Sequence, residues 1–129
     1  MREETRRLWL QAKEDAATAQ VLLETKRYYA SVFFAHQAAE KALKALYIHV
    51  KKAPPPRTHN LVELLNLLGI EDEDIIDAAM DLTPEYTVTR YPDAANGVPA
   101  QLYNKRLAEE HLLKAKKIID YCEQLLTEK

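Results

Sequence analysis

Cysteine, glycine and long apolar runs are all scarce in this 129-residue chain, and each scarcity narrows the class of protein. Only two glycines are present, which argues against an all-β protein, because its many turns need that residue. The only cysteine, Cys122, lies in a helical pattern of apolar residues, where we expect a small buried side chain rather than a nucleophile. The first residues, MREETRRLWLQ, contain no apolar run of seven, so we expect no signal peptide, no membrane anchor and a cytoplasmic location.

The residues that are present indicate a single globular domain spanning residues 1–129. Hydrophobic residues make up 47% of the chain and charged residues 29%, which is typical of a folded protein rather than a disordered one. A chain of this length can bury a core without disulfides or a metal. With so few turn glycines, the composition favours an all-α fold.

The stretch from Tyr28 to Lys52 is predicted to be the central helix. Its alanines and larger apolar residues recur every three or four positions, which places them on one side of a helix. The alanines lie at positions 35, 38, 39, 42 and 45. Such small side chains let a neighbouring helix approach closely. The run Pro54-Pro55-Pro56 must end this helix.

The rest of the chain predicts an antiparallel up-and-down bundle of three long helices and two short ones. The other long helices are expected from Arg2 to Thr25 and from Gln101 to Leu126. One short helix is expected to be capped by Thr58 and closed by Gly69, and a second to span about residues 71–82. Residues 83–100 hold three of the six prolines and are predicted to be a long loop, either functional or packed by its own aromatic residues.

Charge is distributed unevenly along the chain although its net value is only −2. No acidic residue occurs from Lys41 to Val62, a stretch that also contains Lys44, Lys51, Lys52 and Arg57. This pattern predicts either a positive end of the bundle that could meet phosphates or a solvated lysine face.

Three segments resemble the HEPN family of nucleotide-associated helical bundles. They are AHQAAEKALKAL at residues 35–46, THNLVELL at 58–65 and TRYPDA at 89–94, in the order found in the family. The resemblance implies a compact bundle that pairs as a homodimer and associates with a minimal nucleotidyltransferase. It also implies a possible function, because many members of the family have a metal-independent RNase activity within toxin–antitoxin or defence systems.

In that family the RNase activity depends on an arginine followed four to six residues later by a histidine, near the start of the last long helix. Arg106 and His111 match this spacing, although the residue after the arginine is Leu107 where active members usually have a polar one. Five helical steps place His111 about 140° around the helix from Arg106, so both reach one site only with an irregular helix start or a partner subunit. The alternative is a solvated Arg106 and a partly buried His111.

Several residues are candidates for binding a nucleotide or phosphate. His36, Glu40 and Lys44 share a helix face, where they form either part of a ligand site or a structural ladder of ion pairs. His59 could face a phosphate or hold the turn that follows the prolines. Lys41 belongs to the same basic stretch.

The turn containing Arg90, Tyr91 and Asp93 could bind a phosphate and stack on a base. It could equally be a structural clip in which Asp93 holds Arg90. The four histidines make no zinc pattern, so we expect no metal and no cofactor.

Three functions therefore compete. The first is a homodimeric module that partners a nucleotidyltransferase and binds nucleotide or RNA phosphates without catalysis. The second is a metal-independent RNase toxin that uses Arg106 and His111. The third is a purely structural dimerisation bundle.

Overall fold

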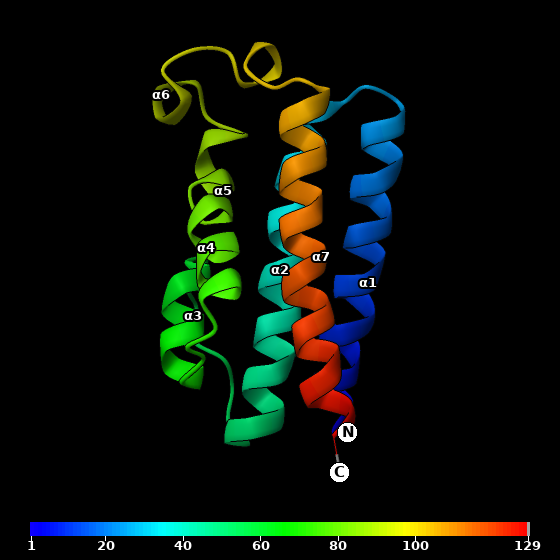
Figure 1. Cartoon of the computed structure of the whole chain (residues 1–129), viewed down its shortest axis with the longest axis vertical. Helices are drawn as coiled ribbons and strands as arrows, with labels where there is room; N and C mark the ends of the chain where they lie inside the picture. The colour runs from blue at the N-terminus through cyan, green and yellow to red at the C-terminus, as the bar shows by residue number, and fades with distance from the viewer. Residues whose placement is uncertain (129) are drawn as a thin grey trace.

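The computed structural model describes residues 1–128 and contains no β-strand in that range. Three long helices form the body of the molecule: α1 (Glu3–Glu24), α2 (Tyr28–Lys51) and α7 (Lys105–Thr127). The shorter helices α3 (Leu61–Leu68) and α4 (Glu73–Leu82) lie beside them (Figure 1). The prediction of an all-α bundle with three long helices and two short ones is confirmed.

Side-chain caps set where three of the helices begin. The side chains of Asn60, Asp72 and Asn104 accept hydrogen bonds from backbone amides in the first turns of α3, α4 and α7. Thr58 was therefore the wrong residue for the cap of α3. Its hydroxyl instead accepts from the Asn60 amide and donates to Glu63. The predicted start of the last helix at Gln101 was also early, because the Asn104 cap starts α7 at Lys105.

Residues 83–100 are not the structureless loop that the prolines predicted. They form three single turns, α5 (Glu85–Val88), α6 (Pro92–Ala95) and the 3-10 turn η1 (Pro99–Gln101). A proline at the first position of a turn loses no hydrogen bond, because the first amides of a helix have no partner within it, and the fixed φ of proline already suits the helix. Prolines therefore begin α6 and η1 rather than preventing them.

Left-handed residues end two of the predicted elements. Gly69 closes α3 with φ of 68°, as predicted. Lys52 ends α2 with φ of 56°, and one residue, Ala53, separates it from the proline run. Lys26, in the tight turn between α1 and α2, has φ of 65°.

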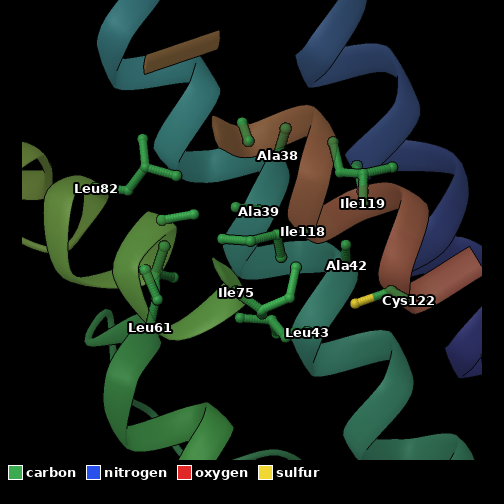
Figure 2. Packing of buried hydrophobic residues seen from close by; sticks show 14 of the residues in the cluster. Ala38, Ala39, Ala42, Leu43, Leu61, Ile75, Leu82, Ile118, Ile119 and Cys122 are labelled. Carbon is green, nitrogen blue, oxygen red and sulfur yellow. The ribbon is translucent and has the colours of Figure 1, made fainter. Parts of the chain in front are cut away.

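The core lies around α2, which packs against α1 and α7 and also contacts α3 and α5. All five alanines of its small-residue side are completely buried, as are Leu43 and, on α7, Ile118 and Cys122. Figure 2 shows Ala38, Ala39 and Ala42 facing residues of α7, with side chains from the α3 and α4 side completing the cluster. Burial raises the pKa of the Cys122 thiol to about 12, as expected for a packing residue rather than a nucleophile.

Polar ties reinforce the contact between α1 and α2. The Lys41 ammonium lies 2.6 Å from the buried Asp15 carboxylate, which also accepts from Gln11. The Ser31 hydroxyl donates to the Ala19 carbonyl over 2.7 Å.

Over residues 1–128, no helix has both the length and the apolar character needed to cross a bilayer.

Candidate functional site

Aromatic and charged side chains from three separate segments gather where α5 meets α2. The His59 ring, in the segment before α3, lies flat on the Tyr86 ring of α5, with ring centres 3.7 Å apart and planes within 9°. His36 of α2 approaches the same tyrosine, with ring centres 5.6 Å apart. The sequence therefore brings residues from distant positions to one side of α2.

Glu40 of α2 connects this cluster to a lysine one helical turn further along. Its carboxylate is 7% exposed and accepts a hydrogen bond from His59 Nδ1 at 2.8 Å. Its other oxygen accepts from Lys44 Nζ at 3.1 Å. Glu40 therefore neutralises Lys44 and fixes the orientation of the His59 ring, whose side chain remains 45% exposed.

His36 is completely buried and holds the backbone of the same segment. Its Nε2 donates to the His59 carbonyl at 2.9 Å. Desolvation by burial lowers the pKa of His36 below its usual 6.5, despite the opposing effects of that hydrogen bond and of Glu40. His36 therefore fixes the main chain of His59 while Glu40 fixes its side chain.

Arg90, just after α5, lies among three aromatic rings. Its guanidinium carbon is 4.3 Å from the ring centre of Tyr86, 4.8 Å from that of Tyr91 and 5.1 Å from that of Phe33. Its Nε donates to the Tyr86 carbonyl at 2.8 Å. Within residues 1–128, neither terminal nitrogen of Arg90 has a hydrogen-bond or ion-pair partner, so the four N–H donors of these two nitrogens remain available to a ligand.

Buried polar contacts hold α5 in place. The Tyr103 hydroxyl donates to the Glu85 carboxylate at 2.5 Å, and Glu85 is only 8% exposed. Desolvation and the neighbouring Glu85 raise the pKa of Tyr103 well above its usual value of 10. The buried Thr89 hydroxyl donates to the Glu85 carbonyl at 2.6 Å. The turn that carries Tyr86 and Arg90 is thereby tied to the segment preceding α7.

The structure brings five of the predicted phosphate-binding residues together and leaves two apart. The cluster includes His36, Lys44, His59, Arg90 and Tyr91. Lys41 instead pairs with Asp15 on α1. Asp93 is exposed on α6, and no hydrogen bond or ion pair joins it to Arg90 among the described residues. The predicted clip between that aspartate and arginine is therefore not formed.

The basic stretch that begins at Lys41 does not form one continuous positive surface, because two of its lysines are paired with carboxylates. Lys41 and Lys44 are neutralised by Asp15 and Glu40, because each faces a buried carboxylate. Among the described residues, the positive charge left without a carboxylate at this cluster belongs to Arg90.

Arg106 and His111 lie in the first two turns of α7 and do not contact each other. Arg106 pairs with Glu110 at 3.1 Å, with both side chains largely exposed. His111 is partly buried, and its Nδ1 donates to the Leu107 carbonyl at 2.7 Å. Over the described part of the chain, no three histidine, cysteine or acidic side chains are grouped so that they could hold a metal ion.

Tyr86 and Phe33 were not among the predicted site residues. Tyr86 belongs to residues 83–100, which the sequence left either functional or packed by their own aromatic residues. Tyr86 and Tyr91 flank Arg90 within six residues of the sequence, whereas no local pattern places Phe33 near that arginine.

Comparison with known proteins identifies the family. The model of the HEPN domain matches residues 5–125. The chain belongs to the HEPN family. The resemblance found in the three sequence segments is thus confirmed, and it extends over nearly the whole chain.

Three individual proteins are similar to this chain over most of its length. A Methanocaldococcus jannaschii protein whose name describes it as a candidate toxin is 30% identical, over 92% of this chain and 85% of that protein. A crystal structure of a Thermus thermophilus protein is 34% identical, with a TM-score of 0.85 over 97% of this chain and all of that one. An archaeal HEPN homologue is 28% identical, with a TM-score of 0.84 over 98% of this chain and all of that one.

Proposed function

We propose that this HEPN domain is a toxin-type module that binds the phosphate groups of a nucleotide or RNA at Arg90 and has no catalytic activity of its own. The supporting observation is the guanidinium of Arg90, which lies among three aromatic rings while its two terminal nitrogens have no partner within residues 1–128. An arginine held in this way loses little conformational freedom when it binds a phosphate with both nitrogens.

His59 adds a second polar group near Arg90, on the other side of Tyr86. Two groups whose centres lie 3.7 and 4.3 Å from the centre of one ring cannot share a face without overlapping, so His59 and Arg90 occupy opposite faces of Tyr86. Glu40 keeps Nδ1 of His59 engaged, which leaves Nε2 directed away from that carboxylate. The cluster thus offers one fixed cation and one oriented imidazole to an anionic ligand.

Binding can be measured by fluorescence anisotropy with a labelled RNA in EDTA and by thermal shift with ATP or GTP. We expect Arg90→Gln to weaken binding by about tenfold or more, because it removes a charge-assisted contact. Arg7→Gln is the matched control, since Arg7 is 76% exposed and pairs only with Glu3. Equal loss in both variants would show that the effect is general charge rather than a site.

Cleavage of RNA is the second candidate function, favoured by the relative described as a candidate toxin. His111 would act as general base toward a 2′-hydroxyl, and Arg106 would stabilise the charged transition state. The Nδ1 contact of His111 with Leu107 leaves Nε2 for such a role. Cleavage in EDTA that is abolished by either Arg106→Ala or His111→Ala would overturn the non-catalytic proposal.

The proposal includes a homodimer formed through the groove between the ends of α1 and α7. This groove of about 780 Å³ has Leu23, Leu112 and Leu113 among its lining residues, and Leu113 is 60% exposed. Leu113→Asp should dissociate a dimer measured by light scattering after size exclusion. Leu67→Asp on α3, a residue that is 43% exposed, should not.

A minimal nucleotidyltransferase is proposed as the partner and the cytoplasm as the location, both on the strength of family membership. Co-purification with the product of the adjacent reading frame tests the partner. A dimer that binds no anion and no such partner would instead favour the purely structural bundle.

A further inference from the structure

Tyr91 is the exposed end of the aromatic cluster. It is 51% exposed, whereas Phe33 and Tyr86 are partly buried. The Arg90 guanidinium lies 4.8 Å from its ring centre. Its side chain makes no capping hydrogen bond to α6, which begins at the next residue. Within residues 1–128 no aromatic ring is paired with Tyr91, so nothing in the described structure accounts for its exposure.

The rings and the guanidinium form an alternating stack. His59 covers one face of Tyr86, Arg90 covers the other face, and Tyr91 contacts Arg90 in turn. Tyr86 has no free face left for a ligand. Tyr91 is therefore the aromatic ring of this stack with the most accessible surface. It lies next to Arg90, the one cation of the cluster that has no carboxylate partner within residues 1–128.

We propose that Tyr91 stacks on an unpaired base whose neighbouring phosphate is bound by Arg90. The ligand class is a nucleotide with a free base face, either as a free nucleotide or within single-stranded RNA. Base stacking on an exposed aromatic residue tolerates any base, because every base has a π face. A base inside a duplex has both faces covered by its neighbours and cannot stack on a protein side chain.

This inference rests on the proposed phosphate site but makes a separate demand on the ligand. Arg90 alone would bind inorganic pyrophosphate, duplex RNA and single-stranded RNA through the same charge. Tyr91 adds affinity only for ligands that present a base. The two residues can therefore be separated by choosing ligands with and without a base.

The test measures binding of inorganic pyrophosphate, AMP, a short single-stranded RNA and the same RNA as a duplex, in EDTA at one salt concentration. The wild type should bind the single strand at least tenfold more tightly than the duplex. It should bind AMP at least as tightly as pyrophosphate, although AMP carries less negative charge, because only AMP offers a base to Tyr91. Tyr91→Ala should weaken binding of AMP and the single strand by about tenfold or more. Its effect on pyrophosphate should be much smaller, because the Tyr86 and Phe33 rings and the Tyr86 carbonyl still hold Arg90. Tyr91→Phe should retain the wild-type affinities, because it keeps the ring.

Each outcome decides the proposal. A Tyr91→Ala variant that binds AMP and single-stranded RNA as well as the wild type, or a wild type that binds duplex equally well, overturns the stacking role while leaving Arg90 intact. Loss of every ligand, pyrophosphate included, in Arg90→Gln but not in Tyr91→Ala supports the division of roles. A wild type that binds none of the four ligands overturns the phosphate site and the stacking role together. A single strand that binds far more tightly than AMP identifies RNA as the ligand, and equal affinities identify the free nucleotide.

Discussion

Replacing Glu40 by glutamine tests whether the ladder on α2 stabilises the protein or is merely a solvated pair. Glutamine keeps the shape of the side chain and removes its charge. The Lys44 side chain is 14% exposed and the Glu40 side chain 7%, so neither ion is well hydrated. At their separation of 3.1 Å the Coulomb attraction is about 5 kcal/mol with an effective dielectric constant of 20.

Desolvation offsets much of that attraction in the native protein, but a variant that lacks one partner keeps the other ion buried without compensation. Removal of one member of a buried pair costs about 3 to 5 kcal/mol. We expect Glu40→Gln to lower the free energy of unfolding by about 3 kcal/mol, the lower end of this range, because the aliphatic part of Lys44 can bend and bring its ammonium group toward water. His59 also loses the charged acceptor of its Nδ1 hydrogen bond.

Urea unfolding followed by circular dichroism measures this cost. A loss of about 3 kcal/mol lowers the midpoint by roughly 2 M urea for a domain of this size. Lys44→Met completes a double-mutant cycle, in which the double variant should be at least about 1 kcal/mol more stable than the sum of the single effects predicts. The matched control is Glu3→Gln, because Glu3 pairs with Arg7 at the same helical spacing but with both side chains more than half exposed. If Glu40→Gln costs no more than this control, for which about 0.5 kcal/mol is expected, the reasoning is refuted.

Three further predictions concern the buried interior. The depressed pKa of His36 means that the unfolded chain binds a proton more readily than the folded one, so stability should fall as the pH drops below about 6.5, by up to about 1.4 kcal/mol per pH unit. Urea unfolding at pH 7 and 5.5 should show a smaller fall for His36→Gln, and parallel curves would contradict this origin. Ala42→Leu should destabilise by about 1 to 3 kcal/mol in urea because the residue is fully buried, whereas Ala17→Leu on the exposed side of α1 should change stability by less than about 0.5 kcal/mol. Thr5→Val should raise the free energy of unfolding by about 1 kcal/mol, because the Thr5 hydroxyl is buried without a hydrogen-bond partner within residues 1–128. A less stable variant in thermal unfolding would contradict this reasoning.

The long helices could be predicted because their signal is local. In α2 the alanines repeat at helical spacing, and the spacing alone places them on one buried side. The turns α5 and α6 were missed because prolines indicate a break, whereas Pro84 immediately precedes α5 and Pro92 occupies the first position of α6, where a proline is compatible with a helical turn. Whether a proline stops or starts a turn depends on the residues that follow it and on tertiary contacts such as the one between Tyr103 and Glu85.

The candidate site was predictable to the extent that its contacts lie within one helix. His36, Glu40 and Lys44 share a face by spacing alone, and the pairing of Glu40 with Lys44 follows from it. The stack of His59 on Tyr86 joins two segments separated by α3 and α4, and no local pattern specifies that contact. Lys41 was grouped with the site because a run of basic residues does not reveal which of them face a carboxylate on another helix, and the structure pairs it with Asp15.

The left-handed conformations of Lys26 and Lys52 carry a consequence for how far natural selection has optimised this fold. A side chain at such a φ costs about 1 to 2 kcal/mol, and glycine, which avoids that cost, loses only about 0.5 to 1 kcal/mol of backbone freedom on folding. A glycine at either position would therefore leave the domain slightly more stable. Selection removes variants that fall below a stability threshold and has little effect above it. This fold accordingly has room for engineered heat resistance at these two lysines.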